Sequence, residues 1–526
     1  MAELRWKVVT DRGTTTGTAE WNINEPLRLH PDLPKGIFRQ VTAELDWPME
    51  DGERLFMNGY QTWTYSPELG KTDRLRGVDQ IPKFLTKKYA FDRYGDYHFV
   101  SYGKEPGTSH GFSYCTFRKG DQYKLLASLD DRPGYTIFHY SAKEARLTLE
   151  RDCAGIRHRG GPYAIFDLFR AEGTEDAVYD GWFDAMGVKP RTKEKLAGYS
   201  SWYNHYQNIT NLGVEADFKA CREYLRPGDL FQIDDGWEWK VGDWLKFHPY
   251  KFPLGIYRFA DMAHTYGLKA GLWLAPFICE TDSDLYRDHP DWLLRHEGKP
   301  WRCGANWSGF YALDIDHPGV QDYLKRVFED VFSMYGNDYD LVKLDFLYAA
   351  APFGTDRETR AGRMYRAMEM LRKWCGDKRI LACGVPVMPA FGVADYCRVS
   401  CDVSLDWDDV FYMHAMHRER VSTRQALNNT ILRAPLNGRA YGSDPDVFFL
   451  RTENCRLTEE QKKALATVNA LCGQVFLTSD GKLTEAQKET YAHYRDLFDR
   501  GILEECSVNG ITYSLDGKRE HIDLKL

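Results

Sequence analysis

The sequence predicts a multidomain protein with an N-terminal antiparallel β-sandwich (a supersandwich), a central (β/α)8 TIM barrel and a short C-terminal β segment. The chain has 526 residues, which is more than one compact domain usually contains. Up to about residue 185, short runs of alternating apolar and polar residues are separated by turn residues, as in antiparallel sheets. After that point, short apolar strands alternate with amphipathic helical stretches over roughly 300 residues, which favours a parallel barrel covered by helices.

The first domain is expected to span residues 1–188. A turn-forming stretch at residues 130–134 separates two of its strands, and a polar stretch with one proline at residues 189–195 marks a linker to the next domain. The clearest predicted strands of this domain are residues 123–129, 136–140 and 145–150.

The barrel domain is expected to span residues 189–500. Its clearest helix begins at Pro318, and its apolar residues step by three and four positions up to Tyr335, with Gly336 as the C-terminal cap. Two later helices begin with capping boxes, which pair Thr458 with Gln461 and Thr484 with Gln487. The predicted strands are residues 197–202, 230–233, 270–276, 341–346, 380–383, 397–400 and 474–477. Residues 501–526 form the C-terminal segment, which we interpret as a hairpin around Asp516 and Gly517.

Composition excludes several classes of function. The net charge of −8 and the lack of a basic stretch argue against a nucleic-acid partner. Twelve cysteines occur without a Cys-x-x-Cys pair, no metal-ligand spacing or nucleotide-binding motif is present, and the first twenty residues contain no apolar signal region. We therefore expect a cytoplasmic protein without a membrane partner, with no cofactor and no metal site.

Acidic residues follow several of the predicted barrel strands. In a barrel of this kind, side chains at the strand ends converge on one open face. The acids at these ends are Asp234, Asp235, Asp345, Asp402, Asp444, Asp446 and Asp480. Carboxylates gathered in this way need a ligand's hydroxyl groups, a cation or a positive side chain to compensate them.

Two pairs of residues at these positions favour a role in catalysis or sugar binding over a purely structural role, although each pair has a structural alternative. Lys343 and Asp345 are two residues apart, so both should project into the barrel, where the lysine would keep the aspartate ionised. The alternative is a structural ion pair that fills the barrel interior. Asp234 and Asp235 could bind several hydroxyl groups of one sugar, or could form a solvated Asp-Asp-Gly turn with Gly236.

Tryptophans gather in the same part of the chain. Eight of the fifteen fall between Trp202 and Trp307, and the flat ring of tryptophan suits the apolar face of a sugar, although a single tryptophan more often belongs to the core. Acids at strand ends together with clustered tryptophans suggest a glycosidase, which needs one carboxyl group to attack or activate water and another to protonate the leaving oxygen.

Several segments resemble glycoside hydrolase family 36 of clan D, the α-galactosidases, and in particular its compact bacterial members. They occur in the family's order from residue 58 to residue 446. They are Asn-Gly-Tyr-Gln-Thr-Trp at 58–63, Gly-Tyr-Ser-Ser-Trp-Tyr at 198–203, Phe-Gln-Ile-Asp-Asp-Gly-Trp at 231–237, Gly-Leu-Trp-Leu-Ala-Pro at 271–276, Asp-Ser-Asp-Leu-Tyr at 282–286, His-Pro-Asp-Trp at 289–292, Val-Lys-Leu-Asp-Phe at 342–346, Arg-Val-Ser-Cys-Asp at 398–402 and Asp-Pro-Asp at 444–446.

This resemblance implies hydrolysis of α-linked galactosides with retention and without a cofactor. It implies that Asp345 is the nucleophile and Asp402 the general acid/base. The substrate-binding residues that it implies are Asp234 and Asp235 for the C4 and C6 hydroxyls, Lys343 for the C3 and C4 side, Arg398 for the C2 side, Trp202, Trp273 and Trp63 as walls of the pocket, and Cys383 and Gly384 near the C2 hydroxyl.

Two departures from the family pattern leave alternatives open. The C-terminal region is short, which argues against the family's larger tetrameric assembly, although a homo-oligomer remains compatible with the sequence. A glycine-rich run is absent around residues 384–386, near the C2 substituent, so that an α-N-acetylgalactosaminidase is an alternative. Others are a transglycosylase of the raffinose-synthase type, a non-catalytic galactoside-binding protein, and a protein whose acids gather a divalent cation.

Overall fold

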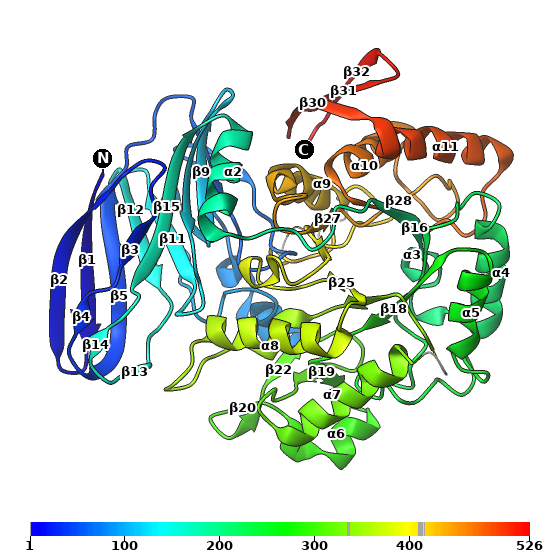
Figure 1. Cartoon of the computed structure of the whole chain (residues 1–526), viewed down its shortest axis with the longest axis horizontal. Coiled ribbons are helices and arrows are strands. Elements are labelled where there is room, and N and C mark those ends of the chain that lie inside the picture. The colour runs from blue at the N-terminus through cyan, green and yellow to red at the C-terminus, as the bar shows by residue number, and fades with distance from the viewer. Residues whose placement is uncertain (1, 334–336, 409–413, 415) are drawn as a thin grey trace.

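The computed structural model describes residues 2–333, 337–408, 414 and 416–526, and it confirms the predicted fold class (Figure 1). The N-terminal part consists of two antiparallel sheets packed face to face. One has the order β2-β1-β5-β12-β11-β8, with β13 paired to β5, and the other β3-β15-β10-β9-β6-β7. The first contains β1 (Ala2–Thr10), β2 (Gly13–Trp21), β5 (Gly36–Asp46), β8 (Thr108–Phe112), β11 (Thr136–Ser141), β12 (Arg146–Arg151) and β13 (Arg157–His158). The second contains β3 (Leu27–Leu29), β6 (Arg54–Met57), β7 (Glu68–Leu69), β9 (Tyr114–Lys119), β10 (Gln122–Ser128) and β15 (Phe166–Gly173).

Alternation along these strands fills the space between the two sheets. In β12, Leu147 and Leu149 are fully buried, whereas their neighbours along the strand are partly exposed. Phe117 from the other sheet and Phe38 belong to the same buried cluster. The period-two pattern of β12 thus places one face of the strand on the core, whereas β9 and β15 of the other sheet are buried on both faces over most of their length.

The central part is a closed parallel barrel of eight strand positions. The pairing runs β16-β17-β18-β24-β25-β26-β27 in one direction, and β16-β29-β28 in the other, and every pair is parallel. The strands are β16 (Leu196–Ser200), β17 (Leu230–Ile233), β18 (Lys269–Leu274), β24 (Leu341–Leu344), β25 (Arg379–Ala382), β26 (Tyr396–Arg398), β27 (Gly442–Asp444), β28 (Val447–Phe448) and β29 (Val475–Thr478).

One strand of the barrel is split in two, and this split closes the cylinder. β27 pairs with β26, while β28, which follows it after two residues, pairs with β29 on the opposite side. Pro445 lies at the break and cannot donate a ladder hydrogen bond, and Asp446 has a positive φ of 77°. The two short segments thus act as one strand that bends inside the acidic Asp-Pro-Asp motif.

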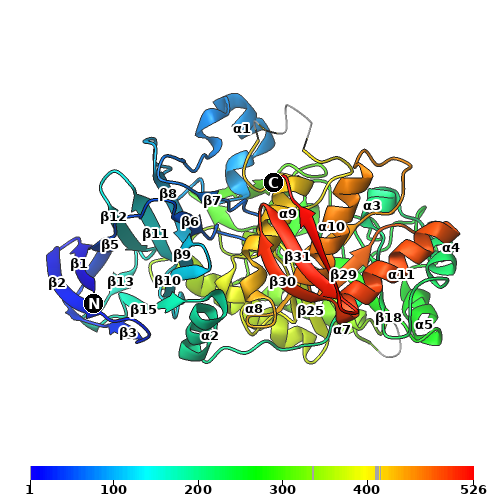
Figure 2. The same ribbon diagram turned by 90° about the horizontal axis from the view of Figure 1, so that it is seen from above.

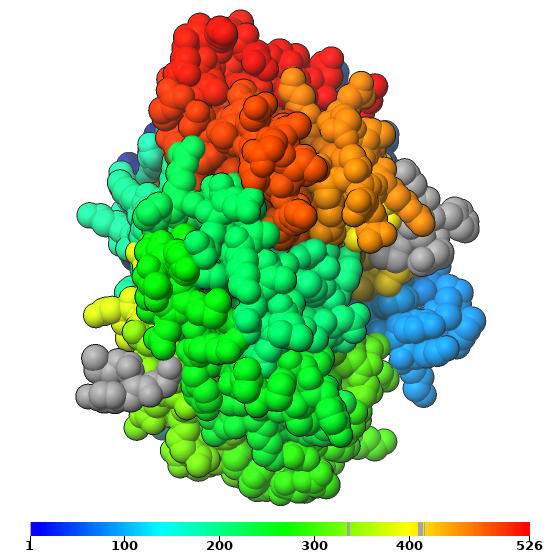
Figure 3. Space-filling model, turned by 90° about the vertical axis from the view of Figure 1, so that its right-hand side faces the viewer, coloured from blue at the N-terminus to red at the C-terminus, as the bar shows by residue number. Residues whose placement is uncertain are grey.

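Helices cover the outside of the barrel (Figure 1), and the green and orange-red surfaces in Figure 3 belong to the segments that contain α4, α5 and α11. The helices of the barrel part are α3 (Trp202–His205), α4 (Asn211–Cys221), α5 (Tyr257–Thr265), α6 (Asp284–Asp288), α7 (Pro318–Val331), α8 (Arg360–Cys375), α9 (Thr423–Leu432), α10 (Glu459–Cys472) and α11 (Glu485–Arg500). Both predicted capping boxes are confirmed, at the N-termini of α10 and α11. Helix α7 ends at Val331, earlier than predicted, and the predicted end at Tyr335 and Gly336 lies outside the described residues.

Two parts of the chain differ from the expected pattern. Between β18 and β24 an insertion forms a small antiparallel sheet of β19 (Ile278–Glu280), β22 (Arg302–Gly304) and β23 (Phe310–Ala312). The C-terminal segment is a three-stranded sheet of β30 (Ile502–Ser507), β31 (Gly510–Leu515) and β32 (Lys518–Asp523), so the predicted two-stranded hairpin was too small. This sheet lies over α9 and α10 (Figure 2). The domain boundaries at residues 188 and 500 stay a prediction.

Helix α2 (Glu175–Met186) fills the space between the sandwich and the barrel. Its Trp182 is fully buried, lies 5.0 Å from the ring of Tyr114 in the sandwich and 5.9 Å from Phe391 in the barrel part, and donates a hydrogen bond of 2.8 Å to the carbonyl of Ser128. Within the described residues, no helix combines the length and apolar character needed to cross a membrane.

We predict that Trp182→Ala lowers the free energy of unfolding by about 3–5 kcal/mol, because it leaves a cavity where the two parts meet. Urea denaturation followed by circular dichroism measures this change. The control is Phe84→Ala, at a side chain that is 71% exposed, which should change stability by less than about 0.5 kcal/mol. A loss at Trp182 as small as the control's would show that this contact does not hold the two parts together.

Candidate active site

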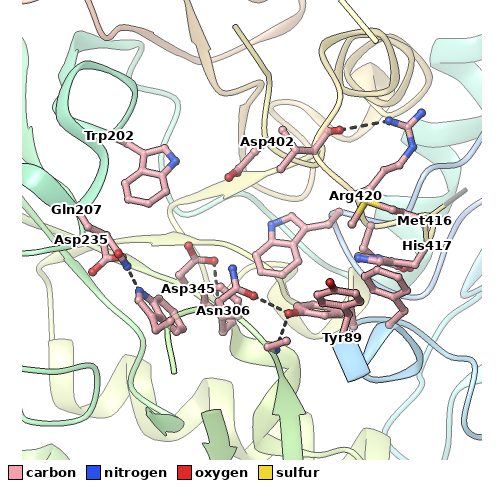
Figure 4. A pocket seen from close by; sticks show the side chains of 18 of the residues that line it. Tyr89, Trp202, Gln207, Asp235, Asn306, Asp345, Asp402, Met416, His417 and Arg420 are labelled. Carbon is pink, nitrogen blue, oxygen red and sulfur yellow. Dashed lines mark hydrogen bonds and ion pairs between the residues drawn. The ribbon is translucent and has the colours of Figure 1, made fainter. Parts of the chain in front are cut away.

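A cavity of about 500 Å³ lies at the carboxyl ends of the barrel strands. Most of the predicted site residues line it, namely Trp63, Trp202, Asp234, Asp235, Trp273, Lys343, Asp345 and Asp402. Arg398, Cys383 and Gly384 stand behind this lining and contact it. Figure 4 shows Asp345 and Asp402 pointing toward the same space beside Trp202. The fold therefore brings together side chains that lie up to 339 residues apart in the chain, from Trp63 to Asp402.

Lys343 does not pair directly with Asp345, which corrects the prediction from their spacing. Its ammonium donates to Asp234 Oδ2 at 2.9 Å. The barrel register explains this, because Ile233 aligns with Leu272 and Leu272 with Val342, so that Asp234 and Lys343 lie at the same level of the barrel. Burial alone would lower the pKa of Lys343, but the charges of Asp234 and Asp345 outweigh it and raise that pKa above its usual range.

Both oxygens of the Asp345 carboxyl group are held by nitrogen donors. Trp273 Nε1 donates to Oδ2 at 3.1 Å, and the backbone N–H of Phe346 donates to Oδ1 at 2.9 Å. Phe346 has a positive φ of 54°, an uncommon conformation for a large side chain, and it turns the chain away directly after the strand. Burial raises the pKa of Asp345 and Asp402 raises it further, while the nearby Lys343 acts against them.

Asp402 is bound to a second cation. Arg398 donates to Asp402 Oδ1 at 2.8 Å, and the same guanidinium contacts Asp444 at 3.2 Å and Asp446 at 2.9 Å. The Asp402 side chain is 35% exposed because it faces the cavity. Its partial removal from bulk water raises its pKa, with a contribution from Asp446, while Arg398 acts in the opposite direction. One arginine thus serves three carboxyl groups, which cannot all be neutralised by a single positive charge.

Asp235 is held by two residues that the sequence patterns did not single out. Gln207 Nε2 and Trp307 Nε1 donate to the same oxygen, Asp235 Oδ2, at 3.0 and 2.9 Å. Trp307 comes from the insertion between β18 and β24, which has no strand-end motif. The cluster of tryptophans that ends at Trp307 was the sequence signal that could have identified this residue.

Trp63 reaches the cavity from the N-terminal part of the chain, as the resemblance implied. Its indole N–H donates to Cys383 Sγ at 3.2 Å. A Cβ at Gly384, whose φ is +59°, would come within 2.7 Å of the Trp63 ring, so only a glycine leaves room for it. The fully buried Arg433 fixes the loop of Trp63, since it donates to Asn58 Oδ1 at 3.1 Å and to the barrel carbonyl of Val399 at 2.8 Å.

The outer wall of the cavity is aromatic and was not predicted. Tyr89 ends helix α1 (Lys83–Tyr89), and Phe91 and Tyr94 follow it. Tyr94 stacks on His417 at 4.8 Å with nearly parallel rings. These three residues lie in a turn-rich segment without a regular pattern of apolar and polar residues. The sequence pattern therefore does not mark them as functional.

Other strand-end residues do not reach the cavity. Asp480 is buried and accepts a hydrogen bond of 2.5 Å from the backbone N–H of Leu450. Trp237 and Trp244 belong to the barrel core. In the ranges that the structure covers, no group of three or more His, Cys, Asp and Glu side chains is arranged to hold a metal ion.

The fold and the cavity define a (β/α)8 barrel protein with several carboxyl groups lining a cavity at the mouth of the barrel. The Melibiase family matches residues 222–368. An α-galactosidase of Lactobacillus acidophilus, Mel36A, is 33% identical over 126 residues, which is 23% of this chain but only 16% of that protein. The chain thus matches less than a quarter of the length of this relative.

Solved structures match over nearly the whole chain. An α-galactosidase of Thermus thermophilus, TtGalA, solved in complex with p-nitrophenyl α-D-galactopyranoside, has a TM-score of 0.76 and 24% identity, covering 99% of this chain and 98% of that one. The family 36 α-galactosidase AgaA of Geobacillus stearothermophilus has a TM-score of 0.61 and 13% identity, covering 97% and 78%. The comparisons confirm the resemblance to the α-galactosidases of glycoside hydrolase family 36.

We predict that Arg398→Ala lowers the free energy of unfolding at neutral pH by about 3–5 kcal/mol, because it leaves buried carboxylates without a cation. The loss should shrink toward pH 4. Burial raises the pKa values of Asp402 and Asp446 and Arg398 acts against this rise, so removing Arg398 should raise both pKa values further. The folded variant then keeps protons that the unfolded chain releases, so its stability falls more steeply than that of the wild type as pH rises.

Urea denaturation at several pH values measures this effect. The control is Arg357→Ala, whose side chain is 88% exposed and 4.0 Å from its acidic neighbour, and which should change stability by less than about 0.5 kcal/mol at every pH. A loss at Arg398 that does not depend on pH would contradict this electrostatic account.

Proposed function

We propose that the protein is a retaining α-galactosidase that removes terminal α-linked galactose from oligosaccharides or glycoconjugates. The observation that carries the proposal is that Asp345 and Asp402 face one cavity while they are bound to different surroundings, two nitrogen donors for Asp345 and the shared Arg398 for Asp402. Two carboxyl groups with distinct environments are what a glycosidase needs. The likeness to α-galactosidases in sequence and fold supports the choice of substrate.

In the first step, Asp345 attacks the anomeric carbon of the galactoside. Trp273 and the backbone N–H of Phe346 fix the orientation of both Asp345 oxygens before the substrate arrives. The positive charge of Lys343 favours the ionised form that attacks, although burial opposes it. The bond to the leaving oxygen breaks, and a β-linked galactosyl ester forms on Asp345.

Asp402 supplies the proton for the leaving oxygen in that step. Burial raises its pKa, which favours the protonated form that a general acid requires. After this proton transfer Asp402 is a carboxylate. Because Asp345 carries no negative charge in the ester, Asp402 stays ionised more easily and serves as the base that takes a proton from water. Water then attacks the ester from the side of Asp402 and releases galactose with the original configuration. Retention implies that the two carboxyl groups work about 5–5.5 Å apart.

The remaining residues of the cavity bind the sugar. Asp234 and Asp235 accept hydrogen bonds from sugar hydroxyls, as the resemblance implies for C4 and C6. Lys343, with its ammonium fixed on Asp234, presents its other N–H donors to the C3 and C4 side. Trp202, Trp273 and Trp63 supply apolar walls, and Cys383 and Gly384, behind Trp63, lie toward the C2 hydroxyl in this assignment. The twelve free cysteines are consistent with a reducing compartment, and we place the protein in the cytoplasm.

Purified protein should hydrolyse p-nitrophenyl α-galactoside in preference to the matching α-N-acetylgalactosaminide. We predict that Asp345→Ala abolishes turnover. Asp402→Asn should lower the rate about 10²–10⁴-fold on a disaccharide and less on the nitrophenyl substrate, whose leaving group needs little protonation. Steady-state kinetics with release of galactose and nitrophenol measures these rates.

The matched control is Asp480→Asn, a strand-end acid that does not line the cavity and whose remaining carbonyl oxygen still accepts from Leu450. It should keep near-normal turnover. Normal activity in Asp345→Ala would eliminate the assignment. Preference for the acetamido sugar would support the α-N-acetylgalactosaminidase alternative, transfer to a sugar acceptor in place of water would support the transglycosylase, and galactose binding without turnover would indicate a sugar-binding protein.

A further inference from the structure

A second cavity of about 260 Å³ lies behind Asp235. It shares three lining residues with the main cavity, which are Gln207, Asp235 and Trp307. Asp235 therefore stands in a wall between two hollows, one that would hold the sugar and one that the mechanism above does not use. Glu238, which lines the second hollow but not the main cavity, also contacts Asp235.

Glu238 is a buried carboxyl group, only 4% exposed, and it comes three residues after Asp235. Gly236 between them has a φ of +114°, which turns the chain back so that the two side chains meet. The backbone N–H of Gly236 donates to Glu238 Oε2 at 3.2 Å, and a side-chain hydrogen bond joins Glu238 to Asp235. Ionised carboxylates only accept hydrogen bonds, so this contact requires a proton between the two groups.

We propose that Glu238 is a positioning residue that holds Asp235 toward the sugar through one shared proton. The inference rests on the proposed function, because it assigns a role to Glu238 in galactose binding. Gln207 and Trp307 already donate to Asp235 Oδ2. A protonated Glu238 adds a third donor from behind, so that the orientation of Asp235 is fixed before the sugar binds.

The charges around the pair decide where the proton is held. Burial and the charge of Asp235 raise the pKa of Glu238 well above its usual range. Burial also raises the pKa of Asp235, with a smaller contribution from Asp234. The other charged or titratable groups facing the pair in this region are Lys240, His248, Lys251 and Glu280. Lys240 is already paired with Glu280 at 3.1 Å and with Asp282 at 2.6 Å, and Lys251 donates to the carbonyl of Gln207 at 2.9 Å.

Sharing one proton leaves the pair with a single negative charge, and a rise in pH should remove that proton. The two carboxylates would then repel one another, and Asp235 would lose the donor behind it. Because proton binding and sugar binding are linked, galactose should bind more weakly as pH rises. The second hollow gives water access to Glu238, so the proton can exchange with solvent.

The test measures the dissociation constant of galactose by calorimetry between pH 6 and pH 9.5. All proteins carry Asp402→Asn, so that the general acid does not titrate. In this parent, the dissociation constant should rise about fivefold or more toward alkaline pH. Adding Glu238→Gln should keep binding near neutral pH, since the amide N–H still donates to Asp235, and should remove the rise or move it up by about one pH unit. Glu238→Leu should bind weakly at every pH.

Glu280→Gln in the same parent is the matched control, because Glu280 lines the same hollow and makes its ion pair with Lys240. It should leave the alkaline rise in place. If Glu238→Gln shows the same pH dependence as the parent, Glu238 is only structural and the inference is wrong. A parent that binds no galactose at any pH overturns the proposed function and this inference together, so the two failures are distinguishable.

Discussion

The mouth of the barrel depends on two buried cations that divide a larger number of carboxyl groups between them. Lys343 holds Asp234, and Arg398 holds Asp402, Asp444 and Asp446. A positive charge is expensive to bury alone, and so is an unpaired carboxylate, so each cation is kept in place by its acids. The acids outnumber the cations, however, and burial raises the pKa values of Asp345, Asp402 and Asp446, which favours their protonated forms. The excess of carboxyl groups over cations thus destabilises the folded state, and it also provides the carboxyl groups that carry protons in the proposed reaction.

The N-terminal part of the chain forms one side of the cavity. Arg433 ties the loop of Trp63 to the barrel with side-chain donors that meet Asn58 on one side and Val399 on the other. Trp63 then closes over Cys383 and Gly384, and the turn-rich segment with Tyr89 forms the outer wall. A barrel without the N-terminal part would keep its carboxyl groups but would lose one side of the cavity, because the walls come from both parts of the chain.

Period-two strands, period-three-and-four helices and acids at strand ends are local signals, and they predicted the fold and the acids at the mouth of the barrel. Trp63, Arg398, Cys383 and Gly384 were implied by the family resemblance alone. Most of the contacts that the sequence patterns missed join residues that are far apart in the chain. Spacing placed Lys343 beside Asp345, yet barrel register brings Asp234 within 2.9 Å of its ammonium. Trp307 lies in an insertion without periodicity, and Glu238 meets Asp235 only because Gly236 turns the chain back. The closing strand is split at Pro445 into pieces too short for a pattern to detect.

The proposed mechanism requires that Asp345 is the nucleophile, which bonds to the sugar, and that Asp402 is the general acid, which carries the proton. Trapping the covalent intermediate tests it most directly. The wild-type protein is incubated with 5-fluoro-α-D-galactosyl fluoride, which forms the galactosyl ester but slows its hydrolysis, and the labelled peptide is identified by mass spectrometry. The account predicts one fluorogalactosyl group per chain, on Asp345. A label on Asp402 or on any other residue, or full inactivation without a covalent adduct, would contradict it.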